Sequence, residues 1–180
     1  MPGPPRRRLS LGWLALPVVL VPLGWLLFAG LGRDPREIPS PLIGHPLPTL
    51  EAMTLDGDAF ASASVAGHPI VVNIWASWCT PCIDEHAVLL DAADAHPELH
   101  VVGVIYQDTA DGARRFLARY GDGGWPNLLD DNGRIAIDLG VTGPPETVFV
   151  DARGIVRARH IGPLTADVMA TLLSGIGVSP

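Results

Sequence analysis

The chain contains only two cysteines, and the segment that carries them constrains the fold more than any other feature. Ile70–Ala76 is an almost continuous run of apolar and β-branched residues, which is typical of a strand buried on both faces of a sheet. The motif Cys79-Thr80-Pro81-Cys82 follows after two residues, and apolar residues at helical spacing begin inside it. A central strand that leads through a C-x-x-C motif into a helix predicts an α/β sheet.

The rest of residues 49–180 alternates between strand and helix patterns. A short hairpin is expected first, around the turn signal Asp56-Gly57-Asp58. The predicted order is β-α-β-α-(α)-β-β-α, with a sheet that is mixed at one edge. After the central strand we expect a helix from Thr80, strands at 100–106, 147–150 and 155–160, and helices at 110–120, 132–139 and 164–173.

The N-terminal part has the pattern of a signal-anchor. Leu9–Gly32 contains 24 residues without a charge, and about 20 apolar helical residues span a hydrocarbon core. Arg6–Arg8 precede this run, so residues 1–8 are expected in the cytoplasm and the following domain on the periplasmic side of the inner membrane. A cleaved signal peptide is the alternative, although its apolar region is normally about 7–15 residues long. Residues 33–48, with five prolines, are predicted to be a linker.

The charge of the chain excludes one class of partner. The net charge is −7, but three of the twelve basic residues are Arg6–Arg8. From Arg33 onward, nine arginines face all nineteen acidic residues, a net charge of −10. An acidic domain repels phosphate backbones, so we expect no nucleic acid partner.

The position of the two cysteines favours redox chemistry. Cys79 is expected at the helix N-terminus, where free N–H groups and the helix dipole lower a thiol pKa. Pro81 suits the first helical turn, because an N–H there would have no partner. Cys82, less than one turn further on, is placed to resolve a mixed disulfide formed by Cys79.

Three other uses of a C-x-x-C pair fit less well. A structural disulfide across three residues closes too small a ring to stabilise the fold much. Covalent haem attachment requires a histidine directly after the second cysteine, and Ile83 is there. A zinc site needs two further ligands, and His86 is the only candidate nearby. We therefore expect no metal and no organic cofactor.

Three segments together resemble one family. Trp75–Cys82 is similar to the W-x-x-W-C-x-x-C stretch of the thioredoxin superfamily. The closer resemblance, over about residues 41 to 175, is to the periplasmic DsbE/CcmG type of cytochrome c maturation. It rests on Cys82–His86 (C-x-x-E-H), Val101–Asp108 (V-V-G-x-x-Y-x-D) and Gly140–Thr147 (G-V-x-G-x-P-E-T). The resemblance implies a thioredoxin-like fold with a central helix-strand insert at about 109 to 140, preceded by one transmembrane helix.

The resemblance also assigns roles to individual residues. Pro145 matches the family's cis-proline, which faces the active-site disulfide, whereas an X-Pro bond without this context is trans in about 94–95% of folded cases. Glu85 is implied to take or return a proton during exchange, and His86 is expected to be structural. The residues expected to contact substrate are Trp78, Thr80, Pro81, Pro144 and Pro145. The chain departs from the family in having Thr-Pro between the cysteines, where Pro-Thr is frequent, and Pro144, where alanine is usual.

The function implied by the resemblance is reduction of a protein disulfide. The expected substrate is an apocytochrome c or a related maturation factor, and a membrane electron-donor thiol protein is expected to re-reduce Cys79 and Cys82. Two alternatives remain open. One is a general thiol-disulfide oxidoreductase for other exported proteins, and the other is a non-catalytic chaperone that holds an apocytochrome or a metal.

Overall fold

The structure, a computed structural model, describes residues 12–31 and 41–178. The chain separates into two units, residues 1–38 and 39–180, which we describe one at a time. In the first unit, α1 spans Gly12–Leu31, and its side chains are described only for residues 16–26. Within the described part of the chain, no helix was found with the length and apolar character that crossing a membrane requires. The expected anchor, residues 9–32, extends beyond the described residues at both ends and stays a prediction, and residues 1–8 lie outside them.

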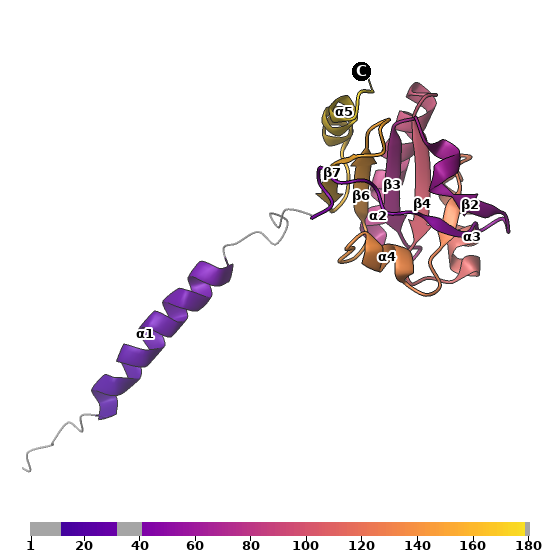
Figure 1. Ribbon diagram of the computed structural model, residues 1–180. Coiled ribbons are helices and arrows are strands. Elements are labelled where there is room, and N and C mark those ends of the chain that lie inside the picture. The colour runs from indigo at the N-terminus through magenta and orange to yellow at the C-terminus, as the bar shows by residue number, and fades with distance from the viewer. Residues whose placement is uncertain (1–11, 32–40, 179–180) are drawn as a thin grey trace, which may run out of the picture. The chain divides into compact units, whose positions relative to one another are not determined.

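The second unit is built on a five-stranded sheet with the order β5-β4-β3-β6-β7 (Figure 1). The central strand β3, Ile70–Trp75, is buried at all six positions, as its apolar run predicted. It pairs in parallel with β4, His100–Ile105, and antiparallel with β6, Glu146–Val150. The edges are β5, Asn127–Leu129, parallel to β4, and β7, Val156–Ile161, antiparallel to β6.

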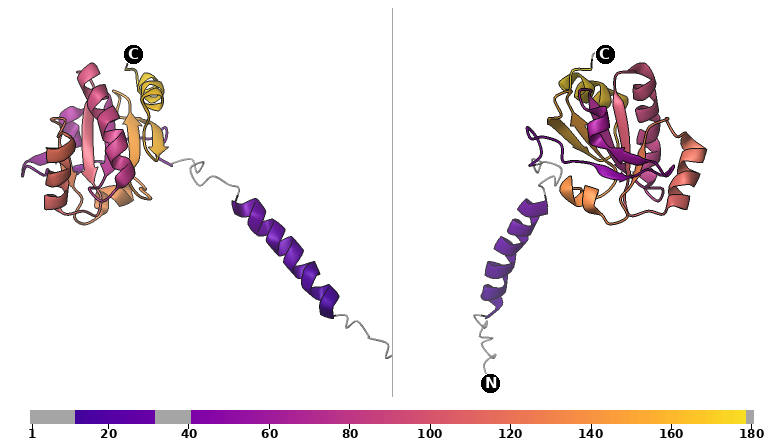
Figure 2. Two further views of the ribbon diagram at one scale, coloured as in Figure 1. Left: turned by 180° about the vertical axis from the view of Figure 1, so that it is seen from behind. Right: turned by 45° about the vertical axis from the view of Figure 1, so that its right-hand side comes forward.

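Helices cover both faces of this sheet (Figure 2). On one face, the even-numbered residues of β3 pack with residues of α4, Arg134–Asp138. On the other face, Val71 packs against α2, Thr80–Ala95, and α5, Ala166–Gly175. A third cluster joins the end of β3 and both cysteines to α3, Ala110–Tyr120. Successive side chains of β3 point to opposite faces, and both faces are covered, which explains why every residue of the strand except Asn73 is apolar.

The start of the second unit differs from the predicted linker. The hairpin of β1, Glu51–Met53, and β2, Ala59–Ala61, forms as expected, and a short 3₁₀ helix, Ser62–Val65, follows. Residues 44–47, however, are hydrogen-bonded to the domain: Gly44 N–H donates to the carbonyl of Val156, at 2.8 Å, and Leu47 N–H to that of Gly154, at 2.9 Å. Residues 41–48 thus belong to the folded unit, because their backbone groups find partners beside β7 that a proline count does not reveal.

The central insert also contains a strand whose place the sequence did not show. β5 has only three residues, Asn-Leu-Leu, and none is β-branched, so its strand pattern is weak. It forms because Gly103–Ile105 of β4 offer a free edge with which it pairs in parallel. The short α4 follows it, within the segment expected to be helical at 132–139.

Candidate active site

The two cysteines lie where the central strand passes into α2. Cys79 is the N-cap residue of this helix, no side chain caps it, and Pro81 lies in the first turn. Cys79 and Cys82 form a disulfide, and their side chains are 3% and 1% exposed. On reduction, the Cys79 sulfur lies at a helix end with unpaired N–H groups, and these stabilise a thiolate. The geometry thus suits Cys79 as the nucleophile and the more deeply placed Cys82 as the resolving thiol.

The loop before Cys79 is fixed to the end of β4. Ser77 N–H donates to Oδ2 of Asp108 at 2.6 Å, and Trp78 Nε1 donates to the carbonyl of Gln107 at 3.1 Å. The indole of Trp78 is nevertheless 56% exposed. A large apolar side chain held in place beside Cys79 suits contact with a protein substrate, the role that the family resemblance implies for Trp78.

The proline loop lies beside this site because of the sheet register. The peptide bond between Pro144 and Pro145 is cis. Ile74 pairs with Glu146 in the antiparallel β3–β6 ladder, so the register places Pro145 next to Trp75, just before the cysteine loop. Pro145 is buried and Pro144 is half-buried. The cis-proline implied by the family resemblance is thus present, at the same sheet edge as the cysteines.

A buried ion pair holds that loop, and the sequence analysis did not identify it. Glu146 is fully buried, and its Oε1 accepts from the N–H groups of Thr142, at 2.7 Å, and Gly143, at 3.1 Å. Its Oε2 accepts from the Arg159 guanidinium, which also donates to the carbonyl of Gly140 at 2.7 Å. The sequence offered one signal for this ion pair, a glutamate directly before the strand sequence Thr-Val-Phe-Val. It could not identify Arg159 as the partner, because the pairing of β6 with β7 brings the two residues together.

Glu85 is buried under the active-site helix. Its side chain is 1% exposed and lies one turn after Cys82 on α2. Oε1 accepts from Asn73 Nδ2 at 2.6 Å, and Oε2 accepts from Leu164 N–H at 3.2 Å. Burial raises the pKa of Glu85 to about 7, although these two hydrogen bonds oppose the shift. A carboxyl with this pKa can give or take a proton near neutral pH, as general acid–base chemistry requires.

Replacing Glu85 should change the acidity and the redox behaviour of the cysteine pair. A charged Glu85 near a Cys79 thiolate disfavours that thiolate, so Glu85→Gln should lower the Cys79 pKa and make the protein a weaker reductant. The thiol pKa and the redox equilibrium with glutathione, measured for wild type and variant, test this. Identical values in the two proteins would remove Glu85 from the reaction, while Cys79 and Cys82 would keep their roles.

His86, the neighbour of Glu85, has a structural environment. Nε2 lies 2.7 Å from the carbonyl oxygen of Gly121, so this nitrogen donates, and the ring packs edge-on against Phe116 and Trp125. Burial lowers the His86 pKa, and the hydrogen bond to Gly121 partly offsets this. Among residues 12–31 and 41–178, no group of three potential metal ligands was found. The arrangement therefore fits a histidine that ties α2 to the loop after α3.

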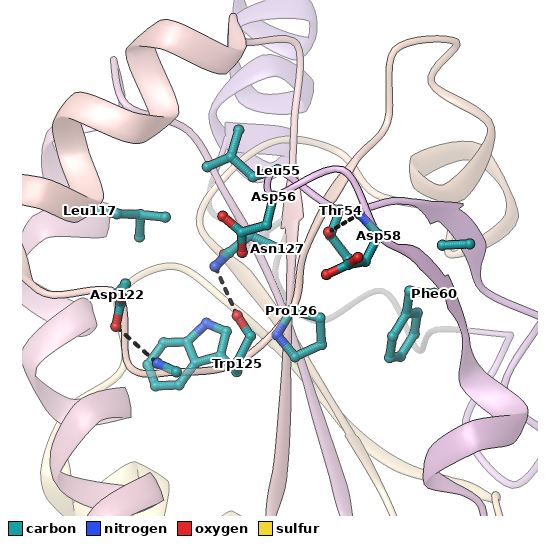
Figure 3. Close-up of a pocket in the computed structure, with 12 residues that line it drawn as sticks. Thr54, Leu55, Asp56, Asp58, Phe60, Leu117, Asp122, Trp125, Pro126 and Asn127 are labelled. Carbon is teal, nitrogen blue, oxygen red and sulfur yellow. Dashed lines mark hydrogen bonds between the residues drawn. The ribbon is translucent and has the colours of Figure 1, made fainter.

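Two pockets differ in their relation to the cysteines. A pocket of about 620 Å³ borders the site, and Trp78, Gln107 and Asp108 line it together with residues of the 129–133 loop. Figure 3 shows another pocket, of about 370 Å³, between the β1–β2 hairpin and the segment before β5. Neither cysteine lines either pocket, but Trp78, the neighbour of Cys79, lines the first and not the second. The first pocket is therefore adjacent to the cysteine loop.

The residues expected to contact substrate lie together at one end of the sheet, but they differ in how exposed they are. Thr80 and Pro81 are exposed on the first turn of α2, next to Trp78. The proline loop approaches from β6, on the other side of β3. The roles of these residues in substrate binding stay predictions, as do the catalytic roles of Cys79, Cys82 and Glu85.

Comparison with known proteins decides the family. The family model described as Redoxin matches residues 42–173. The chain belongs to the Redoxin family. It is 42% identical over 159 residues to the thiol:disulfide interchange protein DsbE of Allochromatium vinosum, covering 84% of this chain and 87% of that protein. It is 38% identical over 140 residues to the DsbE of Escherichia coli K12, covering 76% of this chain and 75% of that protein.

Solved structures support the same assignment of this Redoxin-family chain. The DsbF structure from Mycobacterium tuberculosis has a TM-score of 0.67 at 32% identity, covering 71% of this chain and 94% of that one. A secreted disulfide oxidoreductase of M. tuberculosis, homologous to E. coli DsbE, has a TM-score of 0.64 at 27% identity, covering 69% and 94%. The thioredoxin-like α/β fold and the DsbE/CcmG type are thus confirmed. The chain is a protein-disulfide oxidoreductase, and the two cysteines of its C-x-x-C motif, Cys79 and Cys82, form a disulfide.

Proposed function

We propose that the protein reduces disulfides of apocytochrome c, or of a partner that handles its thiols, during cytochrome c maturation. The observation that carries the proposal is the Cys79–Cys82 pair at the start of α2, beside exposed Trp78 and the cis-proline loop. An extended peptide can approach this site through the loop backbone and the pocket that Trp78 lines. The DsbE relatives support thiol–disulfide interchange, and the apocytochrome substrate is our inference from that family type.

The reaction consists of two exchange steps. The Cys79 thiolate attacks one sulfur of the substrate disulfide, so a mixed disulfide forms and the other substrate sulfur leaves as a thiolate. Cys82 then loses its proton and attacks the Cys79 sulfur, which releases the second substrate thiolate and leaves the Cys79–Cys82 disulfide. Two electrons pass to the substrate, and Glu85 is placed to accept the Cys82 proton. A membrane-bound thiol protein must return two electrons before the next cycle.

Trapping of the mixed disulfide tests this function. In Cys82→Ser the second step is blocked, so Cys79 should accumulate covalently bound substrate proteins, identifiable by mass spectrometry after non-reducing electrophoresis. We expect apocytochromes or their thiol-handling partners among them, and the matched Cys79→Ser variant should capture none. Capture of unrelated exported proteins instead would favour the general oxidoreductase. A chaperone without turnover would leave wild type unable to reduce any disulfide.

We also propose that residues 9–32 anchor the protein in the inner membrane, with the domain on the periplasmic side. The support is the uncharged length of this segment and Arg6–Arg8 on its N-terminal side. Membrane fractionation with N-terminal sequencing tests the anchor. A soluble form that starts near residue 33 would show that the segment is cleaved. The predicted periplasmic location of the domain would be unaffected by that result.

A further inference from the structure

Two arginines next to the active site, Arg115 and Arg119, have no carboxylate partner among the described residues, unlike the other arginines of the domain. Seven arginines lie in residues 41–178, and five of them form ion pairs with carboxylates at 4 Å or less. Arg115 and Arg119 form neither an ion pair nor a side-chain hydrogen bond within the described residues, and both are exposed. The Arg119 guanidinium lies 5.3 Å from the ring centroid of its neighbour Tyr120. The paired arginines are Arg114, Arg134, Arg153, Arg157 and Arg159.

These two arginines lie one helical turn apart on α3 and face the cysteine segment. They line a pocket of about 300 Å³ together with Ser77 and Ile83, which flank the segment from Trp78 to Cys82. The packing of α3 fixes this position: a Cβ at Gly112, one turn before Arg115, would lie 2.7 Å from Ser77 Oγ. α3 therefore approaches the active-site loop as closely as its backbone allows, and it carries both guanidinium groups along the border of the site.

This positive pair is unusual in its surroundings. The described part of the second unit has seven arginines against seventeen acidic residues. A neighbouring pocket, which Trp78 lines, is bordered by Asp108, Asp130 and Asp131. Like charges at i and i+4 destabilise a helix, and Asp111, four residues before Arg115, is paired with Arg114, so an outside negative group would offset the repulsion between Arg115 and Arg119. The pocket also exposes Tyr120 and Ile83, which are only partly buried and offer apolar contact.

We propose that Arg115 and Arg119 form a docking site for an acidic segment of the protein whose sulfur exchanges with Cys79. The proposal rests on the proposed function and specifies its partner: carboxylate side chains near the partner's reactive cysteine. A partner that reaches Cys79 brings its neighbouring residues over the pocket that Ser77 and Ile83 share with the arginines. Charge pairs at the rim of such a contact act mainly on the association rate and its salt dependence.

The test compares two synthetic peptides, each with one internal Cys-x-x-Cys disulfide. One carries three glutamates beside the cysteines, and the other carries glutamines at the same positions. Reduced full-length protein in a non-ionic detergent is mixed with each peptide, and its oxidation is followed by fluorescence. Wild type should reduce the glutamate peptide about tenfold faster at low ionic strength. The advantage should nearly disappear at about 1 M salt, where the Debye length is about 3 Å.

The matched variants isolate the arginine pair. In Arg115→Gln/Arg119→Gln, the ratio of the glutamate-peptide rate to the glutamine-peptide rate should fall about tenfold below the wild-type ratio. Arg134→Gln/Arg153→Gln removes the same charge elsewhere and should keep the preference. Because each variant is tested with both peptides, the intrinsic difference in reactivity between the peptides cancels.

Each contrary outcome has a distinct meaning. Equal rates for the two peptides in wild type, or an unchanged preference in Arg115→Gln/Arg119→Gln, would overturn the docking site. If no peptide is reduced at all, the proposed function fails, and binding of a glutamate peptide with serines in place of cysteines still decides the docking site. Loss of the preference on adding phosphatidylglycerol vesicles, but not phosphatidylcholine vesicles, would assign the arginines to lipid headgroups and overturn the proposal.

Discussion

Arg159→Met should destabilise the protein by about 3–5 kcal/mol, because it leaves the Glu146 carboxylate buried without its cationic partner. Glu146 is fully buried, and the Arg159 side chain is 9% exposed. Methionine keeps most of the length of the arginine side chain, so the change removes charge and hydrogen bonds more than volume. The free energy of unfolding in urea, measured on the oxidised protein, gives the effect.

Two further variants separate this ion pair from a general loss of positive charge. Arg134→Met removes an arginine that is 75% exposed and paired with Asp138, and it should cost less than about 1 kcal/mol. The double variant Glu146→Gln/Arg159→Met should recover part of the stability lost in Arg159→Met, because no unpaired charge is then buried. A cost below 1 kcal/mol for Arg159→Met would show that the ion pair does not hold the proline loop.

The second large effect is a loss of stability with rising pH that depends on Glu85. Burial raises the Glu85 pKa in the folded protein to about 7 from the ordinary value of 4.5. The folded state therefore holds this proton more tightly, and its stabilising effect is complete below pH 4.5 and is lost as pH rises to about 7. A difference of about 2.5 pKa units corresponds to roughly 3 kcal/mol.

The measurement is the free energy of unfolding of wild type minus that of Glu85→Gln, from pH 4.5 to 7.5 in the oxidised protein, where neither cysteine titrates. This difference should fall by about 3 kcal/mol over that range. His86 acts in the opposite sense, because its lowered pKa removes stability as pH falls, but it is present in both proteins and cancels. Glu51→Gln, at an exposed position, controls for the loss of one negative charge. A flat difference would show that Glu85 ionises equally easily in both states.

Much of the fold could be predicted because local pattern and burial agree. The apolar run at Ile70–Ala76 became the buried central strand, and the helix expected at 110–120 has those bounds in the structure. Thr109 caps that helix by accepting from Gly112 N–H, which gives its start a local signal. The cis bond before Pro145 came from family resemblance, since the residues alone favour trans.

The features that the sequence did not reveal depend on partners far away in the chain. β5 forms because β4 leaves an edge free, and residues 44–47 are fixed by backbone groups at 154–156. The contact between Glu146 and Arg159 follows from the β6–β7 pairing. The sequence contains these residues, but which groups meet is decided by strand pairing that no local pattern specifies.

The central claim is that Cys79 attacks and Cys82 resolves, and the most direct test is the alkylation rate of each cysteine in the reduced full-length protein as a function of pH. Iodoacetamide labelling at short times, quantified separately for the two cysteines by peptide mass spectrometry, gives both rate profiles. Cys79 lies at the N-terminus of α2, so its labelling should be faster and should reach half its maximum below the ordinary thiol pKa of about 8.5. Faster labelling of Cys82 near neutral pH would contradict the assignment of the nucleophile.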